Sequence, residues 1–385
     1  MILPPNSAKP MTVLQIVPKL DTGGAERSAI EIAEALVAAG HRAIIVAKPG
    51  RWSSWAQRVG AELIALDLGR KSPLVLLSLF KLRCILLAVQ PDIVHTRSRL
   101  PSWLTWLTLK SLAKSKRPKW ATTVHGLHSV SRYSAIQHAG TLAIAVSETA
   151  KNYVLKHYPN VRSMDLTVIE RGADTKLFYP AQNTAAWQSA FYAQFPGLIG
   201  KKLLLLAGRG TRLKGHSDAL HLLANLRQHG VDAALFFAGI VEAERSNYLI
   251  EIKQLCADLD LTDVTIFSAS RTDLPALYAH AALVLQLSNR PESFGRTVAE
   301  ALLCGAAVLG FDHGGVGEQL RAAYPAGLVP LGDRAQLVER ALALLQTPAH
   351  DFAVDLAKVP TLTQMQGKTL GCYQALLQLQ IKTSY

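Results

Sequence analysis

Two glutamates in the segment from Arg290 to Ala301 are spaced so that both could bind one ligand. Glu292 and Glu300 stand eight positions apart, with the turn Ser293-Phe294-Gly295 between them. Eight residues of helix would span roughly 12 Å, whereas carboxylates that share acid and base roles on one bond lie about 5–10 Å apart. The spacing therefore favours two carboxylates that each accept hydrogen bonds from a separate hydroxyl group of one long ligand.

The turn between the glutamates could also bind an anion. It precedes a predicted helix, and the first N–H groups of a helix have no acceptor inside it. These N–H groups and the helix dipole favour a negative group such as phosphate. A ligand with hydroxyls at two separated places and phosphate between them is a nucleotide sugar. The alternative is that Glu292 and Glu300 are ordinary surface acids.

Apolar runs on both sides of this segment predict the strands that would position it. Residues 281–287 precede it, and residues 306–311 follow it and end in the glycine-rich turn from His313 to Glu318. Strand, loop, helix, strand and glycine turn is the layout of an open α/β sheet that binds a ligand at its strand ends.

Two cations could complete a phosphate site. Arg209 follows a strand predicted at residues 203–207, and Lys214 stands at the start of the next predicted helix. Cations in these places can neutralise a diphosphate and stabilise it as charge develops on a leaving group. Arg212 lies between them and is ambiguous, and a plain charged loop is the alternative for the whole segment.

These motifs carry a resemblance to a known family. The segment from Pro291 to Glu318 resembles the glutamate-pair signature of the retaining GT-B glycosyltransferases of family 4. Other family-like motifs occur in the expected order, so the resemblance covers nearly the whole chain. They are Gly23-Gly24-Ala25-Glu26-Arg27, Thr123-Val124-His125-Gly126, Ala145-Val146-Ser147-Glu148, Ala207-Gly208-Arg209 and Lys214-Gly215.

The resemblance implies an enzyme that moves a hexose-type sugar from a nucleoside-diphosphate sugar to a hydroxyl acceptor, with retention. It implies that Arg209 and Lys214 hold the donor diphosphate. Glu292 would bond a hydroxyl of the transferred sugar, and Glu300 the ribose. His125 would contact the donor sugar, although a structural histidine is the alternative. The remaining expected donor contacts are Gly23, Gly24, Ser293, Phe294 and Gly295. From their place after a predicted strand, Arg97 and Arg99 could face the acceptor, and a solvent-exposed loop is the alternative.

No metal site and no resident cofactor are predicted. Asp258-Leu259-Asp260 matches the Asp-x-Asp string of metal-dependent transferases, but it ends a predicted helix away from the strand ends. Two cations and a helix N-terminus can stabilise the diphosphate charge instead, so we expect metal-independent transfer. The base of the donor stays open, because a UDP-sugar and a GDP-sugar are both compatible with these residues.

The alternation of strands and helices predicts an α/β chain of the GT-B type, with two doubly wound Rossmann-like domains facing across a cleft. A chain of 385 residues exceeds what one hydrophobic core usually supports. We expect a disordered leader over residues 1–10 and an acceptor-binding domain over 11–180. A nucleotide-sugar-binding domain would follow over 181–360, and a helix over 361–385 would cross back to the first domain.

Positive charge is concentrated in the first half of the chain. Residues 1–180 hold 24 Lys and Arg against 11 Asp and Glu, whereas residues 181–385 hold 17 of each. Such a field attracts an anionic membrane surface, an anionic glycan or a lipid-linked acceptor. Nucleic acid is not expected, because the basic residues are not interleaved with aromatics in a compact module. A solvated basic surface without a partner is the alternative.

Composition points to a cytoplasmic protein. The four cysteines are far apart and lack metal-ligand spacing, as in reduced thiols. The segment from Asp92 to Trp103 resembles transferases of the lipopolysaccharide core. We therefore expect a polysaccharide-assembly enzyme that is peripheral at the inner face of a bacterial inner membrane. The alternatives are a nucleotide-sugar epimerase of the same fold and a non-catalytic protein that binds a nucleotide sugar or a polyanion.

Overall fold

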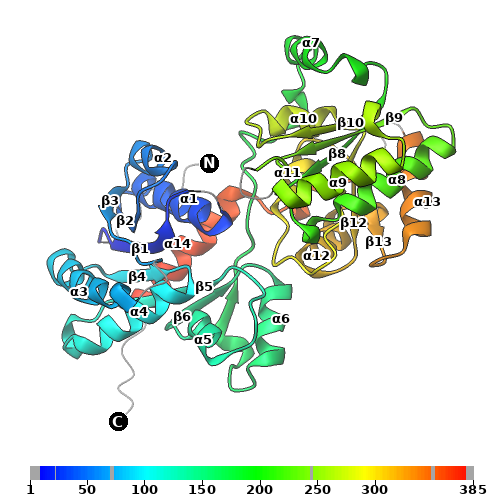
Figure 1. Ribbon diagram of the computed structural model, residues 1–385. Helices are drawn as coiled ribbons and strands as arrows, with labels where there is room; N and C mark the ends of the chain where they lie inside the picture. The colour runs from blue at the N-terminus through cyan, green and yellow to red at the C-terminus, as the bar shows by residue number, and fades with distance from the viewer. Residues whose placement is uncertain (1–8, 22, 70–72, 243–245, 348–351, 379–385) are drawn as a thin grey trace. The chain divides into compact units, whose positions relative to one another are not determined.

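The chain divides into two units, each with its own parallel sheet and hydrophobic core (Figure 1). A computed structural model describes residues 9–21, 23–69, 73–242, 246–347 and 352–378. The first unit comprises residues 1–171 and 363–385, and the second comprises residues 172–362. Each unit is described by itself below.

The described part of the first unit contains a seven-stranded parallel sheet in the order β3-β2-β1-β4-β5-β6-β7. Val13 pairs with Ala43 on one side and with Ile93 on the other, so β1 is a central strand and the order reverses between β1 and β4. The strands are β1 (Thr12–Lys19), β2 (Arg42–Lys48), β3 (Glu62–Ala65), β4 (Ile93–Thr96), β5 (Lys119–Val124), β6 (Leu142–Ala145) and β7 (Leu166–Val168).

Helices cover this sheet and bury its apolar side chains. Leu14 and Val94 of the sheet pack in one cluster with Leu82 and Leu104 from the helices. The helices are α1 (Gly24–Ala38), α2 (Ser53–Arg58), α3 (Leu77–Val89), α4 (Arg99–Ser111), α5 (Arg132–Ala135), α6 (Glu148–His157) and α14 (Leu362–Gln378).

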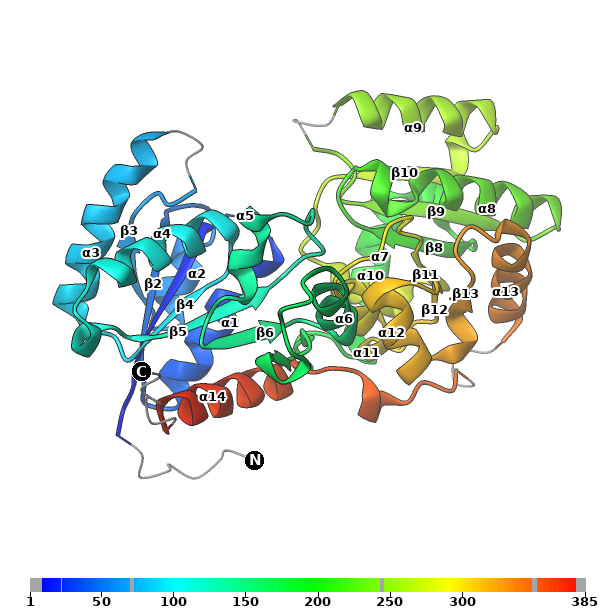
Figure 2. The same cartoon turned by 90° about the horizontal axis from the view of Figure 1, so that it is seen from below.

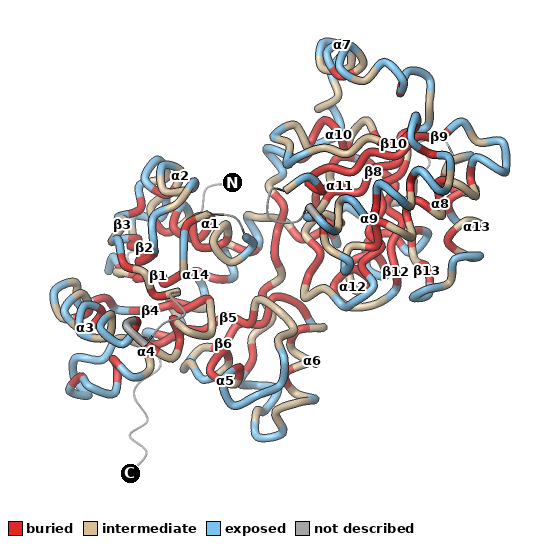
Figure 3. Tube along the Cα trace, viewed as in Figure 1, coloured by how far each residue is buried: buried red, intermediate tan, exposed pale blue. Residues whose placement is uncertain are grey.

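The second unit contains, within its described residues, a six-stranded parallel sheet in the order β10-β9-β8-β11-β12-β13. Every residue of β9 is buried, as expected for a parallel strand that helices cover on both faces (Figure 3). The strands are β8 (Lys202–Ala207), β9 (Ala233–Ala238), β10 (Thr265–Ser268), β11 (Leu283–Gln286), β12 (Val308–Phe311) and β13 (Leu328–Val329). The helices are α7 (Ala185–Gln194), α8 (His216–Gln228), α9 (Ser246–Asp258), α10 (Leu274–His280), α11 (Arg296–Leu303), α12 (Gly314–Ala323) and α13 (Arg334–Gln346).

The two sheets confirm the predicted pair of Rossmann-like α/β domains. The connection between the units differs from the prediction, which placed the boundary after residue 180. Ala173 forms a bridge with Thr361, and its N–H donates to the carbonyl of Pro360 at 3.1 Å. Because the outgoing and returning segments pair with each other, residues 172–180 belong to the second unit. The predicted leader lies, over residues 1–8, outside the described residues.

The last helix returns to the first unit, where it lies along α1 (Figure 2). The side-chain amide of Gln366 donates to the backbone carbonyl of Glu31 on α1 at 2.8 Å. Tyr373 is fully buried and its hydroxyl lies 2.5 Å from Nδ1 of His95. The helix therefore supplies part of the core of the first unit. None of the helices over the described residues is both long enough and apolar enough to cross a bilayer.

Candidate active site

The predicted residues of the second unit gather where its strand order reverses. The chain leaves β8 for β9 on one side, while β11 and β12 continue on the other side. In open parallel sheets, ligands bind outside the carboxyl ends of the strands at such a point. Arg209 and Lys214 follow β8, Glu292 follows β11, and His313 follows β12. The sheet thus brings these four side chains to one edge.

Lys214 and Glu292 form an ion pair at this edge. The ammonium of Lys214 donates to Oε1 of Glu292 at 2.7 Å, and the two side chains are 22% and 23% exposed. The hydroxyl of Ser288 donates to the same oxygen. A ring nitrogen of His313, Nε2, lies 2.5 Å from the carbonyl oxygen of Ser288. The other carboxylate oxygen, Oε2, accepts no hydrogen bond from the residues that the structure describes.

This environment fixes the charge of Glu292. Burial alone would raise the pKa of the carboxyl, but the charge of Lys214 and the hydrogen bonds from Lys214 and Ser288 outweigh it. The pKa of Glu292 therefore lies below its ordinary value, and the group is an anion at neutral pH. An ionised carboxylate can only accept hydrogen bonds, so Oε2 is suited to a ligand hydroxyl.

The backbone at Gly215 sets the place of Lys214. Gly215 has a φ of +73°, and a Cβ there would collide with the carbonyl group of Leu287 at the end of β11. Asn289 ties the same loops together, because its N–H donates to the carbonyl of Leu213 and its side-chain amide to that of Arg212, both at 2.9 Å. Glycine is needed here so that the turn carrying Lys214 can touch the loop carrying Glu292.

A second close approach places the loop after β11. A Cβ on Gly314 would lie 2.7 Å from the carbonyl oxygen of Glu292, and one on Gly315 would lie 2.5 Å from Cα of Phe294. The N–H of Gly315 donates to the carbonyl of Glu292 at 2.8 Å. The glycine pair therefore lets the start of α12 pack directly against the backbone that carries Glu292.

The helix after the turn is shorter than the spacing argument assumed. Because α11 begins at Arg296, Glu292 lies in the loop, and the helical rise does not apply over all eight residues. Gly295 caps the helix with a φ of +82°. The backbone N–H groups of Phe294 and Gly295 have no acceptor among the described residues, and the anion site predicted there stays a prediction. Glu300 is only 5% exposed, with the hydroxyl of Tyr278 3.5 Å from its Oε2.

The cations after β8 have different surroundings. Arg209 is exposed, and its guanidinium has no hydrogen bond or ion pair within the described part of the chain. Arg212 pairs with Glu251 on α9 and lies over the ring of Tyr248, with 5.6 Å between the guanidinium carbon and the ring centre. Arg212 therefore contacts α9 rather than Glu292, the partner of Lys214.

The Asp-x-Asp string lies at the end of α9, as the sequence predicted. Asp258 accepts a hydrogen bond from the side chain of Gln254 at 2.8 Å, and Asp260 is exposed. Within the ranges that the structure describes, no group of three or more His, Cys, Asp or Glu side chains is arranged to hold a metal ion.

In the first unit, His125 follows β5 at the carboxyl edge of the sheet. The guanidinium of Arg171, which comes shortly after β7, contacts Nδ1 of His125 and lies 3.1 Å from Nε2. Burial first, and then the charges of Arg171 and Arg97, hold the pKa of His125 well below its ordinary value. His125 is therefore neutral at pH 7. The role predicted for it, a contact with the donor sugar, stays a prediction.

Burial of Arg97 does not fit its predicted contact with the acceptor. The residue is 2% exposed, and its guanidinium donates twice to the side-chain oxygen of Gln15, at 3.1 and 2.6 Å. Arg97 directly follows β4, and its side chain points inward, toward Gln15 on the neighbouring central strand β1. Arg99 is half-buried at the start of α4, 5.3 Å from the ring centre of Tyr133. Gly23 and Gly24 are exposed at the start of α1.

Two residues of these sites were not predicted. Ser288 donates a hydrogen bond to the carboxylate of Glu292. It comes directly after the apolar run of β11, and this place at a strand end could have identified it as a site residue. Arg171, which holds His125, was not singled out as a site residue by any motif. Its contact depends on β7, a strand of three residues that is too short for a sequence pattern to reveal.

Models of two sequence families match the two units in turn. Residues 22–177 match the family described as Glycosyltransferase Family 4, and residues 193–358 match Glycosyl transferases group 1. A curated relative is N-acetyl-alpha-D-glucosaminyl L-malate synthase of Bacillus anthracis, 23% identical over 66% of this chain and 65% of its own length. Another is the lipopolysaccharide core biosynthesis mannosyltransferase LpcC of Rhizobium leguminosarum bv. viciae, 26% identical over 48% of this chain. The chain spans only half the length of LpcC.

Solved structures share the fold over nearly the whole chain. A glycosyltransferase from Rickettsia africae ESF-5 is 26% identical, with a TM-score of 0.84, and the match covers 97% of this chain and 100% of that one. Anabaena Alr3699/HepE in complex with UDP-glucose is 18% identical, with a TM-score of 0.79 over 95% of this chain and 100% of its own. Since the sheets, the two family models and these structures agree, the chain belongs to the GT-B glycosyltransferases.

Proposed function

We propose that this protein transfers a hexose-type sugar from a nucleoside-diphosphate sugar to a hydroxyl group of a glycan or a lipid-linked acceptor. The observation that carries the proposal is the Lys214–Glu292 pair at the point where the strand order of the second sheet reverses. It combines a cation for a diphosphate with an anion for a hydroxyl. The UDP-glucose complex of the HepE structure supports a nucleotide-sugar donor, which for this chain would be a UDP- or a GDP-sugar.

Donor binding would rearrange the ion pair. The diphosphate would take the ammonium of Lys214 and the guanidinium of Arg209, and the N–H groups of Phe294 and Gly295 would add donors at the helix N-terminus. Glu292 would keep the hydrogen bond from Ser288 and accept one from a sugar hydroxyl at Oε2. The ribose hydroxyls would reach the nearly buried carboxylate of Glu300 and donate hydrogen bonds to it.

In the transfer step, the bond between the anomeric carbon and the diphosphate oxygen breaks as the acceptor oxygen bonds to that carbon. Negative charge develops on the leaving diphosphate, where Arg209 and Lys214 stabilise it. The acceptor proton passes to the leaving phosphate, so no protein base is needed. We propose that the step retains the anomeric configuration and needs no metal, because the cations and the helix N-terminus supply the positive charge.

The acceptor would belong to a bacterial lipopolysaccharide or a related polysaccharide. The likeness to the LpcC mannosyltransferase supports this class, and so does the excess of basic residues in the first half of the chain. A basic first unit suits an anionic, lipid-linked acceptor at the inner face of the inner membrane.

The test is transfer by variants of the ion pair. Glu292→Ala and Lys214→Ala should each lose about a hundredfold or more of the rate while they remain folded, because Lys214 stabilises the charge on the leaving diphosphate and Glu292 positions the transferred sugar. Asp258→Ala is the matched control, since it removes an exposed carboxylate of the same unit. Full activity of either pair variant would remove that residue from the proposed mechanism.

A further inference from the structure

The outward face of α3 is apolar, which is unusual for a helix at the surface of a unit. Leu77 and Phe80 are 68% and 71% exposed, and Leu76 just before the helix is 55% exposed. Cys84 continues the same face at helical spacing, while Leu82 and Leu86 on the opposite face are buried in the core. Large apolar side chains that gather on the outer face of a helix mark a surface that another molecule covers.

Charge around this helix is mostly positive. Between Asp67 and Glu148 the sequence holds one acidic residue, Asp92, against twelve Lys and Arg. Lys81 lies among the exposed apolar side chains of α3, and Arg83 lies at the border of that face. A covering surface must therefore be anionic as well as apolar.

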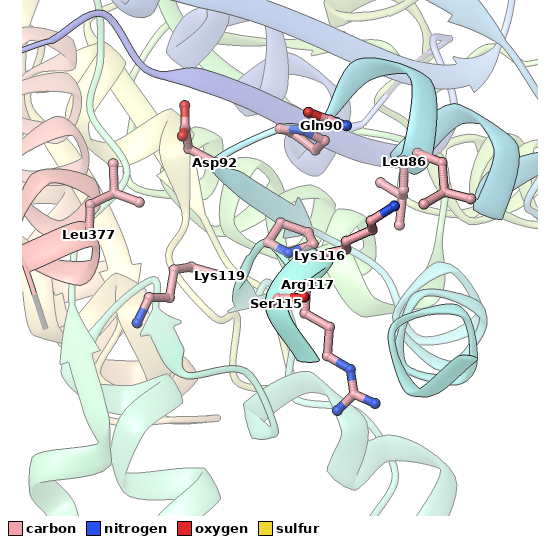
Figure 4. Close-up of a pocket in the computed structure, with 11 residues that line it drawn as sticks. Leu86, Gln90, Asp92, Ser115, Lys116, Arg117, Lys119 and Leu377 are labelled. Atoms are coloured by element: carbon pink, nitrogen blue, oxygen red, sulfur yellow. The ribbon is translucent and has the colours of Figure 1, made fainter. Parts of the chain in front are cut away.

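A pocket of about 550 Å³ shows that more basic side chains lie beside α3 (Figure 4). Leu86 and Leu87 of α3 form one side of it, and the segment 115–119 forms another. Lys116 and Lys119 stand at its wall in Figure 4. Arg117 is held back, because its guanidinium donates to the carbonyls of Leu112 and Lys110 at the end of α4. The pocket thus places a lysine-bearing loop beside the end of α3, on the side of Leu86 rather than on that of Leu77 and Phe80.

We propose that the outward face of α3 docks on an anionic lipid bilayer. Leu76, Leu77 and Phe80 would enter the boundary between headgroups and acyl chains, and the lysines would attract anionic headgroups. Apolar insertion and basic attraction together give reversible attachment, whereas either alone is weak. The role of this attachment rests on the proposed function, because it would bring the enzyme to a lipid-linked acceptor. The docking itself does not depend on catalysis.

The experiment is flotation of the full chain with vesicles of phosphatidylcholine, with and without phosphatidylglycerol. The chain should float only with the anionic vesicles. The double variant Leu77→Ser with Phe80→Ser should bind them at least about tenfold more weakly, because two apolar side chains no longer enter the bilayer. Lys81→Glu with Lys116→Glu should bind more weakly and respond less to salt.

Matched controls lie on the second unit. Ile250→Ser changes an apolar side chain that is 64% exposed on α9, and Lys253→Glu reverses an exposed charge on the same helix. Both should bind vesicles like the unchanged chain. The α3 side chains are exposed, so their variants should keep the thermal unfolding midpoint, and this is measured in parallel.

Three results would overturn the proposal. They are the absence of vesicle binding, equal binding to neutral and anionic vesicles, and unchanged binding by the Leu77–Phe80 variant. A dimer in solution that this variant converts to a monomer would show instead that a second copy covers α3. Thermal stabilisation by nucleotides, measured without vesicles, tests the proposed function separately, so either idea can fail while the other stands.

Discussion

At the scale of single residues, the site keeps a carboxylate charged where burial alone would neutralise it. Glu292 is held as an anion by one ammonium and one hydroxyl, both on its Oε1. The pair also keeps Lys214 close to the strand ends when no diphosphate is present. The same two charges would serve the ligand after the pair separates: Lys214 would exchange the carboxylate for a diphosphate, and Glu292 would exchange the ammonium for a sugar hydroxyl.

Removal of the lysine tests this reading of the charges. In Lys214→Ala the burial of Glu292 persists while its main cation is lost, so the pKa of Glu292 should rise from its lowered value. The fraction of ionised carboxylate would then begin to fall at a higher pH than in the unchanged chain. A titration of the Glu292 side chain by NMR measures this shift. An unchanged pKa would mean that Ser288 or another group sets the charge.

At the scale of elements, glycines decide how closely the site loops approach. Gly215 brings the turn after β8 against the end of β11, and the pair Gly314–Gly315 brings α12 against the loop after β11. In both cases the position of a side chain is occupied by backbone atoms of the neighbouring loop. The site therefore depends on backbone contacts as much as on its charged side chains.

Two glycines with nearly the same φ distinguish the cost of the backbone conformation from the cost of a close contact. Gly215 and Gly200 have φ values of +73° and +78°, but a Cβ on Gly200 would meet nothing within 4 Å. Gly200→Ala should cost about 1–2 kcal/mol for the left-handed conformation alone. Gly215→Ala should cost at least about 1 kcal/mol more, because its Cβ collides with Leu287. Urea unfolding of the second unit measures both, and equal losses would show that the close approach adds nothing.

The sequence predicts the elements better than their contacts. The strands predicted at residues 203–207, 281–287 and 306–311 lie within two residues of β8, β11 and β12, because buried parallel strands are apolar runs between turn signals. The strands β7 and β13 escaped prediction, since three and two residues carry no pattern. Lys214 and Glu292 were predicted as separate ligands. Their pairing joins positions 78 apart and could be seen only after the sheet was folded.

Arg97 shows what a sequence motif leaves out. Its place after a strand is typical of a ligand-binding residue. The neighbouring strand in the sheet, β1, carries Gln15, whose amide oxygen accepts hydrogen bonds from the guanidinium in the interior. A sequence motif gives the position of such a residue along the chain. The direction of its side chain depends on a partner 82 positions away, which the motif does not contain.

At the scale of the whole molecule, the chain returns to its first unit to complete a buried polar cluster. The last helix contributes Tyr373, whose hydroxyl meets Nδ1 of His95, while Nε2 of the same ring lies 2.7 Å from the hydroxyl of Thr123. Burial raises the pKa of Tyr373 to about 12, so the hydroxyl stays neutral. Both ring nitrogens of the buried His95 thus have hydrogen-bond partners only when this helix is in place.

Tyr373→Phe tests this dependence. It leaves one nitrogen of His95 buried without a partner, so the first unit should lose about 1–3 kcal/mol of stability. Tyr324→Phe in the second unit is the matched control. The hydroxyl of Tyr324 is buried and has no partner among the described residues, so its removal should leave stability unchanged or higher. Chemical unfolding measures both variants. Equal effects would mean that the hydrogen bond to His95 contributes nothing.

A donor screen tests the central claim most directly. The purified chain would be incubated with UDP- and GDP-sugars in the presence of EDTA, while nucleotide release and thermal stabilisation are followed. The proposed function predicts that one nucleotide raises the unfolding midpoint and that its sugars are slowly hydrolysed despite the chelator. No stabilisation and no release with any of these donors would contradict a metal-independent sugar transferase and would favour a non-catalytic protein that binds polyanions.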